Sequence, residues 1–448
     1  TGGVKHVRFW KQTASGLVSK KGIWGSKGKI QPLLCATAHQ NKLLTGTVTG
    51  DIYVWQGNTI TQVVRVVLEA SVKHKSVTCL FARPGGLVSG HKDGTIRLWS
   101  DSYDVKDTFN VATDAKPRTM SPAVRSVCLN EDNSVILVGT LGCEIYEVSV
   151  ATRRFTLRAE GHFRHELWGL ATHPSGPHLA VTGGDDRTVR VWDLHSHTLV
   201  NKTEMDTMCR AVAWSPDGAM LGLGLGGRVG RKVRQKDGAH AVLRADTLEC
   251  IHQGRDSKQW IQDVKFNASG TTFAVASHDN VIYLYDARGG RFSLKARCTA
   301  HHSYISHIDF SADGAFMQSN SGDYELLFWN ASNGDQMTSA TSTRDVEWHT
   351  WTCTLGWPVQ GIWPAESDGT DINGVDRSHS GKYVATSDDF GRVRVFSYPV
   401  ITKGLYDPVV GEGHSSHVTN VRWNADDSYL LTTGGNDKTL FQWKVVET

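Results

Sequence analysis

The stretch VTGGDDRTVRVWD, residues 181–193, decides the fold. It joins two segments of alternating apolar and polar residues through a turn of small and acidic residues, and the second segment ends on a tryptophan. The same design recurs in VSGHKDGTIRLW (88–99), QSNSGDYELLFW (318–329) and TTGGNDKTLFQW (432–443). Alternation with a period of two is typical of β-strands with one buried face, and Asp-Gly or Asp-Asp turns predict hairpins.

The repeats are numerous and evenly spaced. Nine copies end between Trp55 and Trp443, and a partial copy ends at Trp10. Most copies follow a further strand and turn, so each repeat of about 40–45 residues predicts a small antiparallel sheet of about four strands, which is the signature of a WD-repeat β-propeller. Because one propeller holds about 4–8 blades, we predict an all-β chain with two tandem propellers.

The spacing also predicts domain limits. Residues 1–157 are expected to form the C-terminal blades of a first propeller that is N-terminally incomplete, because the opening TGGVKHVRFW resembles the second half of a blade. Residues 158–448 are expected to form a second propeller of six or seven blades. The repeat distance widens between Trp329 and Phe396, and we expect extra strands at about 340–375.

Each repeat also predicts a buried polar chain. A histidine, a serine or threonine, an aspartate and the final tryptophan can join through hydrogen bonds, as buried polar groups require. The predicted sets are His162, Thr182, Asp186 and Trp192; His301, Ser319, Asp323 and Trp329; His414, Thr433, Asp437 and Trp443; and His74, Ser89, Asp93 and Trp99. These sets give several of the twenty histidines a structural role.

The composition argues against several function classes. A formal net charge of +3 provides no global field for nucleic acid, and no apolar run is long enough to span a bilayer. Eight scattered cysteines without a C-x-x-C pair predict buried free thiols. Gly222, Gly224 and Gly227 spell G-x-G-x-x-G, but no apolar helical face follows, so they predict a glycine-rich blade strand. We predict no catalytic, cofactor or metal site and no membrane partner.

The chain resembles one particular family over nearly its whole length. The matching segments are VKHVRFW (4–10), GDIYVW (50–55), ELWGLATHP (166–174), SHDNVIYLY (277–285), NSGDYELLFW (320–329), TCTLGWPVQGIWPAESDGTDIN (352–373), DDFGRVRVFSYP (388–399) and GHSSHVTNVRW (413–423). They resemble the tandem atypical propellers of the echinoderm microtubule-associated protein-like family, most closely the members with several tandem copies of this unit. The resemblance implies an irregular second propeller and binding of tubulin.

Two basic segments are the candidate contacts with such an acidic partner. Residues 1–50 contain eight lysines and arginines and no acidic residue, and SKKGIWGSKGK is interpreted as a loop between blades. RVGRKVRQK, at 228–236, is interpreted as a lengthened hairpin. The candidate tubulin-binding residues are Lys20, Lys21, Lys27, Lys29, Arg228, Arg231, Lys232, Arg234 and Lys236. The alternative for each segment is a solvated loop without a partner.

The tryptophan-rich segment 344–373 also allows two interpretations. Trp348, Trp351, Trp357 and Trp363 lie close together, and each indole has about 150–250 Å² to bury. They form either the core of added structure or an exposed aromatic anchor for a partner. The family resemblance, together with the two basic segments, implies a non-enzymatic microtubule-associated protein of the cytoplasm and cytoskeleton, with a place in the ciliary axoneme. The alternative is a general WD-repeat scaffold without direct tubulin contact.

Overall fold

The computed structural model describes residues 1–65, 76–227, 237–364, 367–405 and 407–446. The chain forms two compact units, Thr1–Phe163 and Arg164–Thr448. The boundary expected from the repeat spacing, between residues 157 and 158, lies slightly before this division.

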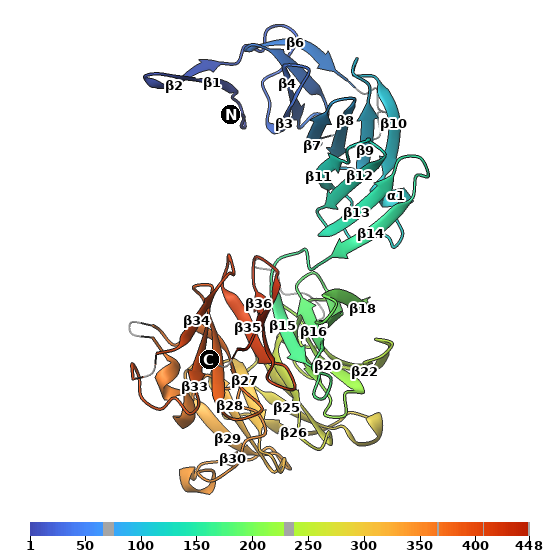
Figure 1. Cartoon of the computed structure of the whole chain (residues 1–448). Helices are drawn as coiled ribbons and strands as arrows, with labels where there is room; N and C mark the ends of the chain where they lie inside the picture. Colours follow the sequence, from blue (N-terminus) through green and yellow to red (C-terminus); the bar gives the residue numbers. More distant parts are fainter. Residues whose placement is uncertain (66–75, 228–236, 365–366, 406, 447–448) are drawn as a thin grey trace. The chain divides into compact units, whose positions relative to one another are not determined.

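Unit 1 is built of antiparallel sheets whose strands follow one another along the chain. A hairpin comes first, and three four-stranded sheets follow in the described part of the unit, arranged along an open arc (Figure 1). The elements are β1 (Arg8–Thr13), β2 (Gly16–Lys21), β3 (Leu33–His39), β4 (Lys42–Thr47), β5 (Ile52–Gln56), β6 (Thr59–Val64), β7 (Val77–Arg83), β8 (Gly86–His91), β9 (Thr95–Trp99), β10 (Val105–Asn110), α1 (Val111–Asp114), β11 (Val124–Leu129), β12 (Val135–Thr140), β13 (Glu144–Ser149) and β14 (Phe155–Glu160).

Unit 2 contains, among its described residues, six sheets of the same kind, five of four strands and a last one of three. Its strands are β15 (Leu167–Thr172), β16 (Leu179–Gly184), β17 (Thr188–Asp193), β18 (Thr198–Glu204), β19 (Cys209–Trp214), β20 (Met220–Leu225), β21 (His240–Arg244), β22 (Cys250–Gly254), β23 (Ile261–Phe266), β24 (Thr272–Ser277), β25 (Ile282–Asp286), β26 (Ser293–Cys298), β27 (Ile305–Phe310), β28 (Phe316–Ser321), β29 (Leu326–Asn330), β30 (Gln336–Met337), β31 (Ile372–Arg377), β32 (Tyr383–Asp388), β33 (Arg392–Ser397), β34 (Val409–Glu412), β35 (Val418–Trp423), β36 (Tyr429–Gly434) and β37 (Leu440–Lys444). In the described part of unit 2, three short 3₁₀ helices join them: η1 (Arg288–Gly290), η2 (Ala340–Ser342) and η3 (Trp357–Ile362).

The sheets of unit 2 close into a ring. Its first strand, β15, lies beside β35 of the last sheet, where the Thr419 hydroxyl donates to the Leu167 carbonyl at 2.6 Å. On the same strands the Thr172 hydroxyl donates to the Trp423 carbonyl at 2.7 Å. These bonds join the two ends of the ring, so unit 2 is a β-propeller and the predicted fold class is confirmed.

Apolar side chains fill the spaces between neighbouring sheets. Val181 and Val191 pack against Leu221 and Leu223 of the following sheet, and all four are at most 4% exposed. The glycines of the G-x-G-x-x-G sequence serve this packing, because a Cβ on Gly222 would collide with the Phe273 ring of the next sheet. Gly222 and Gly224 are residues of β20 that allow close approach of two sheets, whereas Gly227 lies beyond the end of this strand; β21 follows β20 in the described sheet.

The expected extra strands at about 340–375 are not what the structure shows. Among the described residues before β31, this segment contains η2, one isolated β-bridge between Ser311 and Trp348, and η3, in which VQGI lies. Pro358 explains the difference: its fixed φ and missing N–H suit the first turn of a helix and oppose a strand within a sheet.

The segment instead fills a gap in the ring. It lies beside β27, where the Asp309 carboxylate accepts the N–H groups of Thr352 and Cys353 at 2.8 and 2.9 Å. On its other side the Arg377 N–H, in β31, donates to the Trp351 carbonyl at 3.2 Å. The additional residues between Trp329 and Phe396 therefore form a segment, 340–371, whose described residues lie between two sheets of the propeller and which is called the wedge below.

All eight cysteines lie in the described residues and none is in a disulfide. Four of them are buried, whereas Cys143 and Cys250 are exposed, so the expectation of buried thiols is wrong for these two. No helix among the described residues is both long enough and apolar enough to cross a bilayer.

Candidate functional site

The predicted polar chain around His301 links three of its members directly. The Trp329 indole N–H donates to Ser319 Oγ at 2.7 Å, and His301 Nε2 lies 2.7 Å from the same oxygen. Strand pairing explains the geometry, because Met317 lies opposite Trp329 and Ser319 is two residues further on the same face. Ser319 therefore holds an imidazole and an indole together inside the sheet.

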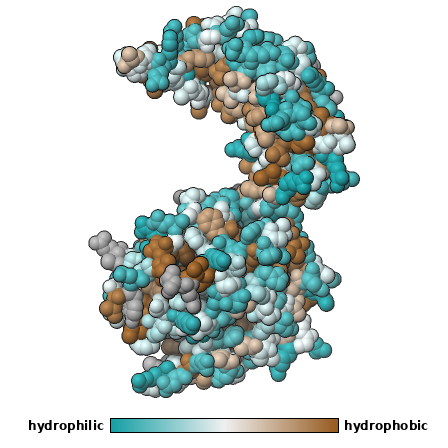
Figure 2. Space-filling model, in the orientation of Figure 1, coloured by the Kyte–Doolittle hydropathy of each residue, from teal (hydrophilic) through white to brown (hydrophobic). Residues whose placement is uncertain are grey.

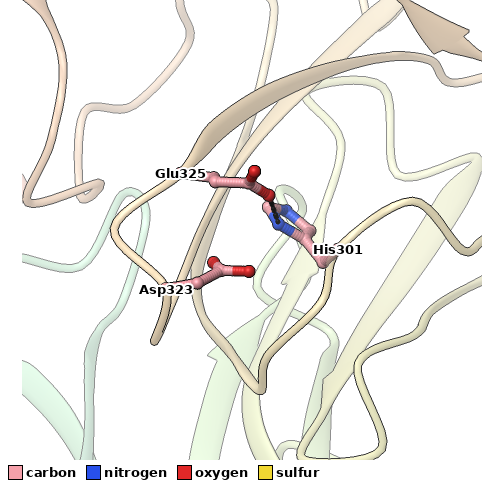
Figure 3. A group of neighbouring side chains, drawn as sticks. All are labelled: His301, Asp323 and Glu325. Carbon is pink, nitrogen blue, oxygen red and sulfur yellow. Dashed lines mark ion pairs between the residues drawn. The ribbon is translucent and has the colours of Figure 1, made fainter.

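Carboxylates surround the other ring nitrogen of this histidine (Figure 3). His301 Nδ1 lies 3.8 Å from Glu325 Oε2, and one ligand atom each of His301, Asp323 and Glu325 lie within 4.8 Å of one another. Asp323 accepts bonds from the Ser321 hydroxyl and the His302 N–H. Burial lowers the pKa of His301 to about 4 against the opposing effect of Asp323, so the ring is neutral at pH 7. The bonds of Asp323 and Ser319 fit a structural role.

The chain around His414 corrects one predicted residue. His414 Nε2 and the Trp443 indole N–H both contact Thr432 Oγ1, each at 2.8 Å, whereas Thr433 contacts Thr419 on the opposite face of β36. The turn GGND carries one residue more than the corresponding turn of other repeats, so counting back from Asp437 is wrong by one position. Asp437 does contact His414, with Oδ2 3.2 Å from Nδ1.

The predicted polar chain around Trp192 has its tryptophan, threonine and aspartate in unit 2 and its histidine in unit 1. The Trp192 indole N–H donates to Thr182 Oγ1 at 2.7 Å, and Asp186 Oδ1 accepts the Thr188 N–H at 3.0 Å. His162 is buried but belongs to unit 1.

In unit 1, the Trp99 indole N–H donates to Ser89 Oγ at 2.9 Å, and His91 Nε2 contacts the same oxygen at 2.9 Å. Asp93 Oδ1 accepts the Thr95 N–H at 3.0 Å. His74, the histidine predicted for this set, lies outside the described residues.

Sequence reasoning missed a second set of buried carboxylates that tie neighbouring sheets together. Asp263 Oδ2 accepts the Ile308 N–H at 3.1 Å and Asp376 Oδ2 accepts the Trp423 N–H at 2.8 Å, in each case from the next inner strand. Burial raises the pKa of both. The signal was an aspartate within the inner strands QDVKF, SHIDF and NGVDR, where a buried face calls for apolar residues.

Asp309 differs from these two carboxylates. Burial would raise its pKa, but the Lys265 ammonium at 2.7 Å and hydrogen bonds from Thr350 and Thr352 prevail and bring the pKa to about 2. Its side chain is fully buried. It is therefore a buried, ionised carboxylate that holds the wedge segment.

Four predicted tubulin-binding lysines are exposed in unit 1, although Lys20 and Lys21 lie on β2 and not in the expected loop. In the β1–β2 hairpin Lys21 is directly opposite Arg8, and Lys20 is opposite Phe9, so the two lysines face opposite sides. Arg8 was not among the candidates, and only the register places it beside Lys21.

The remaining candidate residues lie after the β1–β2 hairpin or in the segment 228–236. Lys27 and Lys29 follow the hairpin, where Lys27 Nζ donates to the Thr61 carbonyl at 2.7 Å and the Lys29 N–H donates to the Tyr53 hydroxyl at 3.2 Å. The second basic segment lies outside the described residues, which include none of its five candidates: Arg228, Arg231, Lys232, Arg234 and Lys236.

The tryptophans of segment 344–373 include both core residues and an exposed residue, so each of the two interpretations applies to part of the segment. Trp348 and Trp351 are 8% and 4% exposed and belong to the core. Trp357 is 63% exposed, at the edge of a cavity of about 780 Å³ that Phe328 and Val346 also line. Figure 2 shows that the visible surface mixes hydrophilic and hydrophobic side chains.

Repeated four-stranded sheets, a closed ring and the Trp–Ser/Thr–His chains define a WD-repeat β-propeller protein. Residues 67–100 match the family model of the WD domain, G-beta repeat. Residues 167–445 match that of the echinoderm microtubule-associated protein second beta-propeller, which is more than half of the chain. The chain belongs to this family.

Proteins of this family match the sequence over nearly the whole chain. Echinoderm microtubule-associated protein-like 2 of Rattus norvegicus is 38% identical over 99% of this chain and 66% of its own length. The Homo sapiens protein of the same name is 37% identical over 100% of this chain and 66% of its own length. The 77 kDa echinoderm microtubule-associated protein of Strongylocentrotus purpuratus is 35% identical over 99% of this chain and 62% of its own length. The chain therefore spans slightly less than two thirds of these relatives.

Proposed function

We propose that this chain is a non-enzymatic microtubule-associated protein that binds tubulin through its propellers, in the cytoplasm and cytoskeleton and on the microtubules of the ciliary axoneme. The observation that carries the proposal is the family membership, since relatives aligned over 99–100% of this chain are named microtubule-associated proteins. Other microtubule-bound or axonemal proteins are further partners in this proposal.

The basic surface of unit 1 supports a contact with an acidic polymer. Residues 1–50 contain no Asp or Glu, and seven of their eight basic residues are exposed: Lys5, Arg8, Lys11, Lys20, Lys21, Lys27 and Lys29. Arg8 opposite Lys21 is an unfavourable pair of like charges. A carboxylate-rich partner such as tubulin would relieve this repulsion, and the attraction would be screened with a Debye length of about 8 Å at physiological salt.

Co-sedimentation with stabilised microtubules tests the proposal. The variant Lys20→Glu/Lys21→Glu should lower the apparent affinity by about tenfold, which corresponds to about 1.4 kcal/mol. It should not unfold the hairpin, because a glutamate at position 21 would face Arg8 with opposite charge.

The control is Lys403→Glu/Lys444→Glu, which makes the same charge change at two exposed positions of unit 2. Equal loss in both variants would indicate a dependence on net charge alone. If the parent chain does not pellet with microtubules at low salt and does not bind soluble tubulin, the proposed function is wrong.

The alternative function is a general protein-interaction scaffold without direct tubulin contact. The 63% exposure of Trp357 at the edge of a cavity that Phe328 and Val346 also line favours it, because aromatic anchors dominate many protein interfaces. The two functions differ in their salt dependence. The charge-reversed hairpin should weaken tubulin binding, whereas Trp357→Ala should weaken a scaffold contact that persists at high salt.

A further inference from the structure

A cavity opens at one end of the central channel of unit 2. Its volume is about 590 Å³. Residues at or next to the start of all six inner strands line it, so it lies on the axis of the ring: Trp168, Arg210, Gln262, Ser306, Asn373 and His417. The end of a propeller channel is a concave site to which every sheet contributes, as ligand sites commonly are.

Aromatic rings form one side of this channel mouth. The Trp260 and His278 rings lie 4.0 Å apart, and His278 is stacked parallel to Tyr304, with centroids 4.5 Å apart. Tyr304 and Tyr324 are 38% and 55% exposed. Gly322 allows the Tyr304 ring to lie against the backbone, since a Cβ there would collide with it. The mouth therefore offers the partly exposed rings of Tyr304 and Tyr324 to a ligand.

Among the described residues, which leave out 228–236, the charged groups of the mouth have an excess of carboxylate. Arg210 is its lining arginine among the described residues, and Asp185 neutralises it through two hydrogen bonds of 2.8 and 2.7 Å. Glu166 is 29% exposed, accepts the Trp168 indole N–H at 2.9 Å and lies 3.8 Å from Arg210. Asp389 is exposed and accepts one bond, from Asn373 at 2.7 Å.

We propose that this channel mouth binds a cationic side chain, an arginine or a lysine, presented by a peptide segment of a partner protein. Aromatic faces attract such a cation with about 0.5–2 kcal/mol, and a carboxylate at the rim adds a charge-assisted hydrogen bond. A phosphate or an acidic segment would meet Glu166 and Asp389 and find Arg210 already paired. The inference is independent of the proposed tubulin contact, because its partner carries the opposite charge.

Isothermal titration calorimetry of the full chain tests this inference. The probe is a short glycine–serine peptide with one central arginine, compared with peptides that carry lysine, citrulline, glutamate or phosphoserine in its place. We expect a Kd of about 1 mM or lower for the arginine peptide. Citrulline, which keeps the shape and loses the charge, should bind at least about fivefold more weakly.

Substitutions locate the site. Glu166→Gln keeps an acceptor for Trp168 and removes the charge, and we expect at least a fivefold loss of arginine-peptide affinity. Tyr324→Ala should weaken binding and Tyr324→Phe should retain it, because only the ring is needed. Glu412→Gln is the matched control, since Glu412 is exposed on β34 and does not line the cavity.

Three results would overturn the inference. One is absence of heat with the arginine and lysine peptides up to about 5 mM, well above the expected Kd. Another is equal binding of arginine and citrulline, or preference for glutamate or phosphoserine. The third is equal loss in the Glu166 and Glu412 variants. If the parent chain binds the arginine peptide but does not bind microtubules or tubulin, the proposed function is wrong and this inference still stands.

Discussion

Replacement of two adjacent threonines of β36 by valine should have very different effects on stability. Thr432 and Thr433 are both completely buried, and valine has nearly the same shape as threonine, so the two variants differ mainly in the hydrogen bonds they lose. Thr432 Oγ1 contacts His414 Nε2 and the Trp443 indole N–H, each at 2.8 Å. Thr433 Oγ1 contacts one side chain, the hydroxyl of Thr419, at 2.9 Å.

The magnitudes follow from the groups left without a partner. Thr432→Val leaves His414 Nε2 and the Trp443 indole N–H without this hydrogen-bond partner, and each buried polar group without a partner lowers the free energy of unfolding by about 1–3 kcal/mol. The His414 side chain is fully buried, while Trp443 is half-buried, so we expect a total of about 2–4 kcal/mol. Thr433→Val should cost less than about 1 kcal/mol, because the Thr419 hydroxyl still donates to the Leu167 carbonyl at 2.6 Å.

Differential scanning calorimetry of the full chain measures both. The transition with the larger enthalpy belongs to unit 2, which is the longer unit, and Thr432→Val should lower its Tm by about 4–8 °C. Thr433→Val should lower the same transition by less than about 2 °C. An equal or larger effect of Thr433→Val would refute the assigned register of the polar chain.

Two further predictions concern buried ionisable groups. Asp309→Asn should destabilise unit 2 by about 3–5 kcal/mol, because it leaves the Lys265 ammonium without its buried partner and puts an amide opposite the N–H groups of the wedge; proteolysis should then cut within 340–371 faster than in the parent chain, and unchanged cleavage would contradict the wedge assignment. The pKa of His301 is lowered by burial to about 4, so its neutral form stabilises the fold fully above the unfolded pKa of about 6.5, and this contribution is lost as the pH falls toward 4. The difference in unfolding free energy between the parent and His301→Gln should therefore shrink between pH 6.5 and 4 in urea titrations, and a constant difference would show that burial does not set this pKa.

The sequence predicts the repeated sheets well because strand pattern and turn residues are local signals. The His301 chain follows from the same spacing, since Ser319 and Trp329 lie ten residues apart, as Thr182 and Trp192 do. The prediction fails at Thr433 because one extra turn residue shifts the count by one position along β36, and a shift of one position along a strand moves a side chain to the other face of the sheet.

The wedge and the hairpin could not be predicted for a different reason. Pro358 was visible in the sequence, but alternation around it favoured strands, and the contacts that fix the wedge come from Asp309 and Arg377, which are distant in sequence. The candidate lysines follow from charge and from an expected loop between blades, and Lys20 and Lys21 lie instead on β2. Only the register of the hairpin shows that Lys20 and Lys21 face opposite sides and that Arg8 lies beside Lys21.

The two proposed contacts rest on opposite charge and respond differently to salt. The hairpin of unit 1 acts through exposed, screened charges, so its affinity for an acidic polymer should fall steeply as salt rises. The channel mouth of unit 2 holds its cation against aromatic faces and near the partly buried Glu166, where screening is weaker. A protein with both contacts could hold a basic peptide segment while it is bound to a microtubule, and raising the salt should release the microtubule before the peptide.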